Sequence, residues 1–148
     1  MDELIFDCIQ ELNIIHPSFH FEVNYFPDEA DPGKFTLHIN EMLVRQAFQN
    51  LLANCITYSS NAKAEIKLDS SENNALKISI INAGKTLSGE EEKYLFSHFF
   101  RGENSRSKIG FGLGLVLAKE IITLHSGSII YSSPAEGLNV FEIRFPLS

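Results

Sequence analysis

The segment Gly110-Phe-Gly-Leu-Gly-Leu115 carries glycines at alternate positions and runs into an apolar helical pattern from about Leu113 to His125. Alternating glycines allow successive backbone amides to point to one side, and a helix N-terminus favours an anion. The spacing G-x-G-x-G differs from the dinucleotide-binding spacing G-x-G-x-x-G, and no long strand immediately precedes it. The segment therefore indicates a phosphate-binding turn, without selecting one nucleotide-binding fold by itself.

A long connection precedes this turn. Residues 83–110 contain four of the nine glycines, a short helical piece and the cations Arg101, Arg106 and Lys108. A connection of this length in a compact domain is usually functional. Three cations just before a phosphate-binding turn favour a lid that faces phosphates over the alternative, a solvated charge cluster.

The pattern from about Glu41 to Tyr58 predicts a long, mostly apolar helix. Gln46, Asn50, Asn54 and Tyr58 are spaced four apart, so they lie along one stripe of this helix. Buried amides need partners, so the stripe either faces solvent or lines a ligand site. In a ligand site, the amide oxygens of the two asparagines would suit Mg²⁺ and its phosphates.

A predicted strand ends in Asn82, and Gly84 follows two residues later. A polar side chain beside a glycine allows a flat ligand to approach the backbone closely. Gly84-Lys85-Thr86 looks like the end of a phosphate-binding P-loop, but that motif needs another glycine five positions earlier. Ser79 stands there, in the middle of the strand, which excludes a P-loop.

The other patterns predict helices and strands mixed along one domain. A helix over about residues 2–14 ends before Pro17. Alternating apolar residues predict strands over about residues 19–25, 35–39, 64–68, 76–81, 128–132 and 140–145. This order favours a two-layer α/β sandwich, with a mixed sheet of about five strands and three helices packed on one face.

Composition narrows the function classes. The formal charge of −7 over 148 residues argues against a general nucleic-acid binder, which needs a basic face. No apolar stretch is long enough for a membrane span, so we expect no membrane contact by this domain. Cys8 and Cys55 lie in apolar helical patterns, which predicts two buried, reduced thiols and a cytoplasmic setting.

In order and spacing, four of these segments resemble the ATP-binding catalytic domain of sensor histidine kinases, within the wider family that includes gyrase, Hsp90 and MutL. The resemblance spans nearly all of residues 1–148 and implies the Bergerat ATP-binding fold, with an ATP lid at roughly residues 85–110. The matching segments are Gln46–Ser59 (the N box), Ile80–Leu87 (the first glycine box), Leu95–Arg101 (the F box) and Gly110–Leu115 (the second glycine box).

The resemblance also implies an ATP site. Asn50 and Asn54 would hold Mg²⁺ and the phosphates, Asn82 would contact the adenine amino group, and Gly84 would allow the purine to lie flat. The other implied nucleotide-binding residues are Tyr58 near the ribose or base, the candidate lid cations Arg101 and Arg106, and Gly110, Gly112, Leu113, Gly114 and Leu115 around the phosphates.

The sequence departs from the family pattern at three positions. Asn82 replaces the usual aspartate, Thr86 replaces the second glycine of its box, and Thr57 stands where many relatives carry a lysine near the phosphates. An amide oxygen can still accept a hydrogen bond from an amino group, so we expect ATP binding to persist. The threonine at position 57 also predicts weaker affinity, in the high micromolar range or above.

Histidine kinases carry a phosphoacceptor histidine followed by Asp or Glu, and none of the five histidines here fits. None of the five, namely His16, His20, His38, His98 and His125, is therefore predicted to accept phosphate, and we interpret them as incidental or structural. We therefore expect an excised, monomeric catalytic domain whose phosphoacceptor domain is absent and which does not autophosphorylate alone. Its partners would be the phosphoacceptor histidine and dimerisation domain of the same kinase, with a response regulator downstream. The parent could be a membrane-bound or a soluble sensor.

Three alternatives remain. ATP hydrolases of the gyrase or Hsp90 kind place a glutamate at the position of Asn50 as general base, and an amide cannot take that proton, so hydrolysis is disfavoured. A serine kinase of the anti-sigma type shares the four boxes. A degenerate domain that binds partners and no nucleotide is the third, and it would show no thermal shift with ATP.

Overall fold

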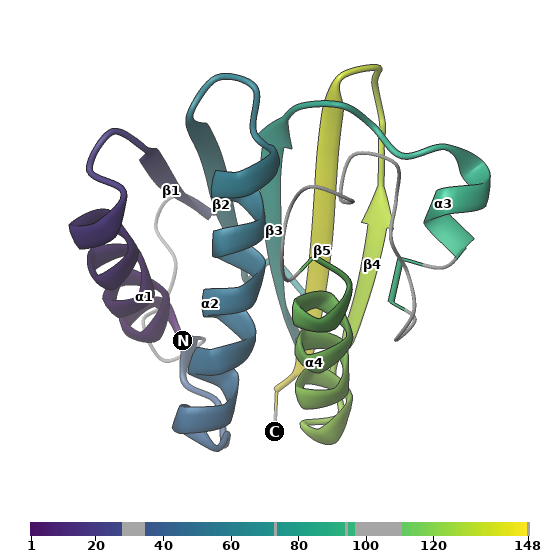
Figure 1. The fold of residues 1–148 in the computed structure, drawn as a ribbon. Helices are drawn as coiled ribbons and strands as arrows, with labels where there is room; N and C mark the ends of the chain where they lie inside the picture. The colour runs from purple at the N-terminus through teal and green to yellow at the C-terminus, as the bar shows by residue number, and fades with distance from the viewer. Residues whose placement is uncertain (28–34, 73, 94, 97–110, 148) are drawn as a thin grey trace.

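The computed structural model describes residues 1–27, 35–72, 74–93, 95–96 and 111–147, with the backbone alone at residues 111–113. The chain folds into two layers, a β-sheet and a layer of helices on one of its faces (Figure 1). Its elements are α1 (Asp2–Ile15), β1 (His20–Phe26), α2 (Glu41–Tyr58), β2 (Lys63–Asp69), β3 (Ala75–Ala83), α3 (Gly89–Lys93), α4 (Phe111–Leu124), β4 (Ser128–Ser132) and β5 (Leu138–Pro146).

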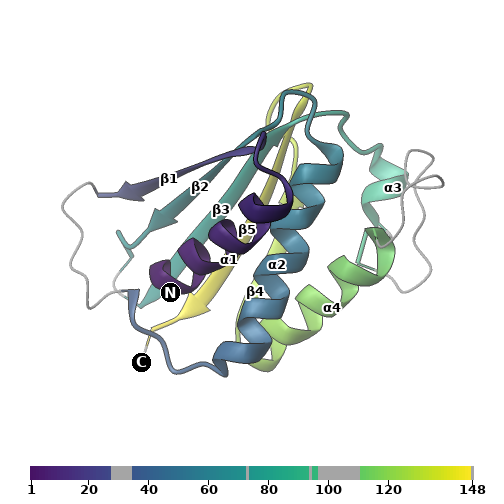
Figure 2. The same ribbon diagram turned by 60° about the vertical axis from the view of Figure 1, so that its left-hand side comes forward.

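The sheet has five strands in the order β1-β2-β3-β5-β4. β1 pairs with β2 in parallel, and the other neighbours are antiparallel, so the sheet is mixed. Residues alternate along β3 and β5 between buried and partly exposed, because one face meets the helices and the other meets water. α1, α2 and α4 cover the same face (Figure 2), while the short α3 lies beyond the β4 edge (Figure 1). The predicted α/β sandwich is confirmed.

α2 forms the centre of the helix layer. Its N-terminus is capped by Asn40, whose side chain accepts a hydrogen bond from the Leu43 N–H at 3.2 Å. Both cysteines are free and buried, as predicted. Burial raises the pKa of the Cys8 thiol to about 11 and that of the Cys55 thiol to about 12, so both remain protonated near neutral pH.

The predicted strand over residues 35–39 is wrong. Residues 36–40 have no regular secondary structure and pair with no strand of the sheet. The alternation that suggested a strand is nevertheless real, because Phe35 is buried against the Tyr25 ring, with ring centroids 5.4 Å apart, and Leu37 and Ile39 pack partly against the core. An irregular segment lying across the core therefore produced the same alternation as a paired strand.

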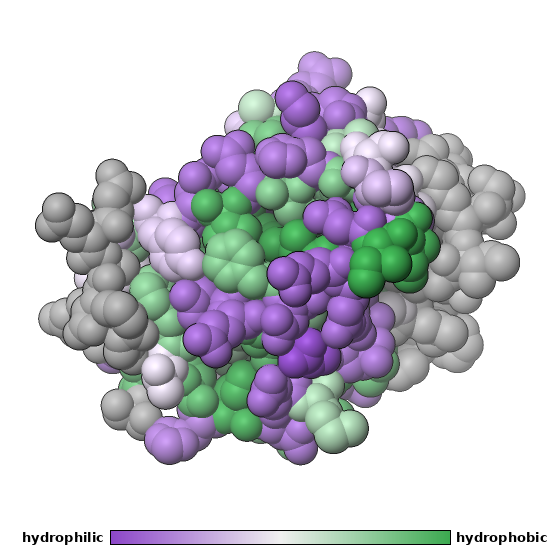
Figure 3. Space-filling view, turned by 90° about the vertical axis from the view of Figure 1, so that its left-hand side faces the viewer, coloured by the Kyte–Doolittle hydropathy of each residue, from purple (hydrophilic) through white to green (hydrophobic). Residues whose placement is uncertain are grey.

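Ion pairs connect α1 to α2 on the outer surface. Arg45 lies 3.2–3.3 Å from carboxylate oxygens of Asp7, Glu11 and Glu41. The view from the α1 side shows hydrophilic residues across much of this face, with apolar residues between them (Figure 3). Exposed pairs of this kind contribute little individually, about 1 kcal/mol or less, so the packing of apolar side chains dominates the contact between the two helices.

Asp69 provides an acid-sensitive contact at the end of β2. Its Oδ1 accepts hydrogen bonds from the Ser71 N–H at 2.9 Å and the Ser71 hydroxyl at 2.6 Å, and Lys77 Nζ lies 3.7 Å from Oδ2. Burial alone would raise the pKa of Asp69, but these hydrogen bonds and nearby lysine charges outweigh it and lower the pKa. The carboxylate form is therefore favoured by folding.

We expect Asp69→Asn to lower the free energy of unfolding by about 1–3 kcal/mol near neutral pH. Because the folded pKa lies below the unfolded one, this stabilisation is present above the unfolded pKa and is lost as pH falls through the folded pKa. In strongly acidic solution the variant and the wild type should therefore be equally stable. Urea denaturation near neutral pH and in strong acid measures the free energy of unfolding of both proteins. An equal difference between them at the two pH values would contradict the prediction.

Candidate functional site

Asn82 lies at the end of β3, on the helix-facing side of the sheet. It is 4% exposed and has the same parity along the strand as the buried Ile78 and Ile80. Its Oδ1 accepts from the Cys55 thiol at a sulfur–oxygen distance of 3.9 Å, and its Nδ2 donates to the Ala83 carbonyl at 3.4 Å. The amide of Asn82 is thus buried beside α2 and oriented by both neighbours.

Gly84 follows at a point where β3 passes very close to the end of α2. A Cβ on this residue would lie 2.4 Å from the Tyr58 carbonyl oxygen and 3.5 Å from the side-chain nitrogens of Asn82 and Asn139. The Gly84 N–H donates to the Gly137 carbonyl at 3.0 Å. No other residue type fits this approach without displacing backbone, so the close packing at this point requires a glycine at position 84.

Asn50 connects α2 to the start of α4. Its Nδ2 donates to the Gly114 carbonyl at 3.4 Å, and its Oδ1 accepts from Gln46 Nε2 at 3.0 Å. A Cβ on Gly114 would lie 3.8 Å from Asn50 Cβ, an ordinary van der Waals contact. The structure therefore brings together two motifs separated by 64 positions in the sequence.

The polar stripe of α2 is partly covered along its length. Gln46 is exposed, whereas Asn50, Asn54 and Tyr58 are half-buried. Of the two interpretations of the stripe, a line of residues bordering a site fits this burial better than a face open to solvent. Thr57, which stands at the position of the usual lysine, is exposed, and its hydroxyl donates to the Ala53 carbonyl of its own helix at 3.1 Å.

α4 begins at Phe111, two residues before the predicted start. Gly112 and Gly114 therefore belong to the first turns of the helix and do not form a separate turn before it. The first four N–H groups of an α-helix have no acceptor within the helix. The backbone donors around residues 111–114 are thus those of a helix N-terminus. Leu115 behind them is 1% exposed and belongs to the core.

Several predicted site residues lie outside the described residues, namely Arg101, Arg106, Lys108 and Gly110. The start of the F box is described. Leu95 is 1% exposed, and Phe96 contacts Phe141 of β5 edge-to-face, with ring centroids 6.3 Å apart. Lys119 Nζ lies 5.2 Å from the centre of the Phe96 ring. Residues 95–96, which lie within the predicted lid, therefore pack against the sheet and α4.

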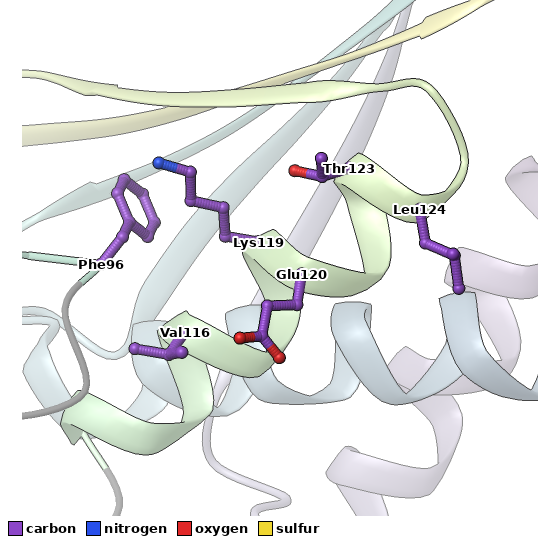
Figure 4. A pocket seen from close by; sticks show the side chains of 6 residues that line it. All are labelled: Phe96, Val116, Lys119, Glu120, Thr123 and Leu124. Carbon is purple, nitrogen blue, oxygen red and sulfur yellow. The ribbon is translucent and has the colours of Figure 1, made fainter.

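Phe96 and Lys119 also border a hollow of about 480 Å³ beside α4 (Figure 4). Val116, Glu120, Thr123 and Leu124 complete its lining. None of Asn50, Asn82 and Gly84 lies there, so this hollow is separate from the site described above.

Three residues near Asn82 and Gly84 are not predicted from the sequence. Cys55 was assigned to the core, although its thiol donates to Asn82. Asn139 lies directly opposite Asn82 in the β3–β5 register, and Tyr131 donates to Asn139 Oδ1. A signal was available for Asn139, which has the same strand parity as the buried Phe141 and Ile143. A polar residue on the buried side of a strand needs a hydrogen-bond partner or a ligand.

Two features are absent from the described residues. No group of three or more His, Cys, Asp or Glu lies close enough together there to hold a metal ion. Among the helices of the same residues, none combines the length and apolar character that a bilayer span requires.

A family model described as histidine kinase-, DNA gyrase B- and HSP90-like ATPase matches residues 39–148. Heme sensor protein HssS of Staphylococcus aureus is 33% identical over 147 residues, which is 99% of this chain and 30% of HssS. Sensor histidine kinase HprS of Escherichia coli K12 is 40% identical over 109 residues, covering 72% of this chain and 23% of HprS. The chain therefore spans under a third of these relatives.

The fold was compared with solved structures separately. A mycobacterial sensor histidine kinase, MprB, superposes with a TM-score of 0.84 at 23% identity, covering 99% of this chain and 95% of the MprB chain. At this identity the likeness establishes the fold alone. It extends from α1 to β5 and so includes the N-terminal elements that precede the family-model match.

Proposed function

The chain belongs to the histidine kinase-, DNA gyrase B- and HSP90-like ATPase family, and from this premise we propose that it binds Mg-ATP and donates the γ-phosphate to a histidine. One observation carries the proposal. α2 meets Gly114 through Asn50, and eight residues further on it meets Gly84 through Tyr58. Two motifs distant in sequence thus contact the same helix. The two contact points are about 12 Å apart along α2, at a rise of about 1.5 Å per residue.

The two ends of this stretch of α2 lie beside groups of different chemistry. At one end Gly84 has no side chain and Asn82 offers a buried amide, which suits the flat, hydrogen-bonding edge of a base. At the other end the N-terminus of α4 offers backbone amides and a favourable potential for an anion. An elongated ligand with a flat base and a polyanionic tail, such as ATP, fits both ends.

The orientation of the Asn82 amide supports a role in recognising an adenine amino group. Because Nδ2 donates to the Ala83 carbonyl, Oδ1 is held on the opposite side of the amide, with a lone pair left besides the contact to Cys55. The reversed amide would bring Oδ1 against the Ala83 carbonyl oxygen. Asn82 therefore supports acceptance from an amino group, as the aspartate of relatives would.

We expect Asn82→Leu to weaken binding of a non-hydrolysable ATP analogue by about tenfold to a hundredfold, because a buried hydrogen bond to the base is lost. Asn82→Asp is the matched control and should retain binding, since a carboxylate oxygen also accepts. Isothermal titration measures both. Equal affinities for wild type and Asn82→Leu would exclude Asn82 from the base site. A wild-type affinity in the low micromolar range would contradict the weakening expected from Thr57.

Asn50 and Asn54 fit a magnesium ion better than a transition metal. Amide oxygens are hard donors, and Mg²⁺ is commonly held by one or two protein groups together with substrate phosphates, without a cage of protein ligands. Asn50 Oδ1 accepts from Gln46 and retains a second lone pair. When bound, the ion would neutralise charge on the phosphates.

The choice of a kinase over a hydrolase rests on Asn50. It faces the N-terminus of α4, where the phosphates would lie, and an amide cannot act as the general base that activates water. Phosphoryl transfer would then depend on positioning and charge stabilisation, to which Arg101 and Arg106 of a lid over residues 85–110 would contribute. We place the domain in the cytoplasm, where ATP is available.

The acceptor would be a histidine on a separate dimerisation domain of the same kinase, with a response regulator downstream. Mixing this chain with such a domain and radiolabelled ATP tests the proposal. Acid-labile, base-stable label on the acceptor histidine is the expected result. Label on serine of another protein would instead support a serine kinase of the anti-sigma type. A flat thermal-shift profile with saturating Mg-ATP would support a domain that binds no nucleotide.

A further inference from the structure

The segment at residues 85–87 is connected to the β4–β5 hairpin by two buried side chains. Tyr131 of β4 is 8% exposed and Asn139 of β5 is 6% exposed. The Tyr131 hydroxyl donates to Asn139 Oδ1 and accepts from the Leu87 N–H at 3.3 Å. Asn139 Nδ2 donates to the Lys85 carbonyl at 3.3 Å. Tyr131 and Asn139 together thus hold the backbone carbonyl of Lys85 and the backbone N–H of Leu87.

The geometry of this pair is determined by its surroundings. The Tyr131 ring packs against Phe141, with centroids 5.3 Å apart, which leaves the hydroxyl little freedom. Burial raises the pKa of Tyr131, although the hydrogen bond from Leu87 opposes the rise, so the hydroxyl remains a donor near neutral pH. Inside a protein, a network of this kind holds its members in place when every member is satisfied.

The same asparagine borders the base end of the site. Asn139 is the register partner of Asn82 across β3 and β5, and both side chains are buried. The Nδ2 atoms of both asparagines lie 3.5 Å from the place where a Cβ on Gly84 would be. The hairpin also accepts the Gly84 N–H at the Gly137 carbonyl, at 3.0 Å. A movement of the hairpin would therefore shift Gly84, which it contacts, and the strand pairing that positions Asn82.

We propose that Tyr131 and Asn139 are positioning residues for nucleotide binding, holding residues 84–87 in the conformation that receives the base. The inference rests on the proposed function, because it assigns a role in the same site. Neither residue needs to touch the nucleotide. Their effect is to keep Gly84 and the adjacent backbone against the hairpin, so that Asn82 remains aligned with the base.

The test is Tyr131→Phe, which keeps the ring and removes only the hydroxyl. We expect affinity for a non-hydrolysable ATP analogue to fall by about tenfold, within the range for network residues that lack ligand contact. Affinity for adenosine should fall by the same factor, because the pair supports the base end. The Leu87 amide should lose protection from hydrogen exchange. Asn139→Leu should act similarly, and the double variant should lose no more than about one single variant does.

The matched control is Tyr25→Phe. The Tyr25 hydroxyl donates to Asp2 Oδ2 at 3.2 Å, and β1 lies at the opposite edge of the sheet from β4. The same chemical change there should leave affinity unchanged. A purely structural Tyr131 would lower the melting temperature without altering the affinity of the folded protein, and that result would overturn the inference while leaving the proposed function intact. If the wild type binds neither ligand, the proposed function fails, and the inference fails with it.

Discussion

Gly84→Ala should weaken binding of an ATP analogue by about a hundredfold, comparable with the cost of a 1 Å misplacement in an active site. The added Cβ would lie 2.4 Å from the Tyr58 carbonyl oxygen, so the end of β3 and the end of α2 must separate. That movement would displace Asn82 from the position in which we propose that it contacts the base. Because backbone must shift, we also expect the free energy of unfolding to fall by about 1–3 kcal/mol. Titration and urea denaturation measure the two effects.

Alanine variants of two other glycines distinguish an effect on nucleotide binding from an effect on stability. Gly127→Ala would place a Cβ 2.7 Å from the Arg144 carbonyl oxygen, so it should destabilise the fold similarly, yet the folded protein should retain its affinity. Gly89→Ala meets no atom within 4 Å and should change neither property. If Gly84→Ala bound the analogue as well as Gly127→Ala does, the close approach at Gly84 would serve folding alone.

Asn50→Ala should remove the magnesium dependence of nucleotide binding. The substitution deletes the amide that contacts Gly114 and that would supply a metal ligand. We expect affinity for the Mg-bound analogue to fall by about tenfold to a hundredfold, the range for weakened metal sites. Affinity measured with a chelator should be almost unchanged, because the base end is intact. Titration of the wild type and of Asn50→Ala with the analogue, once with Mg²⁺ and once with a chelator, measures the magnesium dependence of affinity in both proteins.

Gln49→Ala is the control for Asn50→Ala. It removes the neighbouring amide on the same helix, but that side chain donates to Glu11 of α1, away from the site. Its affinity should match the wild type with and without Mg²⁺. Phosphoryl transfer to the acceptor domain should follow the same pattern, lost in Asn50→Ala and retained in Gln49→Ala. An Asn50→Ala protein that kept a normal response to Mg²⁺ would place the metal elsewhere.

The strongest local patterns in the sequence predicted most of the fold. The predicted helix at residues 41–58 has the observed bounds of α2, because its apolar positions repeat with the helical period over many turns. Alternation predicted every strand of the sheet to within about two residues. The same signal failed at residues 35–39, since alternation reports burial of every second side chain and not hydrogen bonding to a neighbouring strand.

For the proposed site, the sequence by itself pointed to Asn50, Asn82 and Gly84, because each breaks a local rule: two amides in apolar elements, and a glycine just after a strand. Only the tertiary structure decided what surrounds them. The β3–β5 register sets Asn139 opposite Asn82, and helix packing brings Gly114 to Asn50. Register and packing join residues distant along the chain, and no local periodicity encodes which of them will meet.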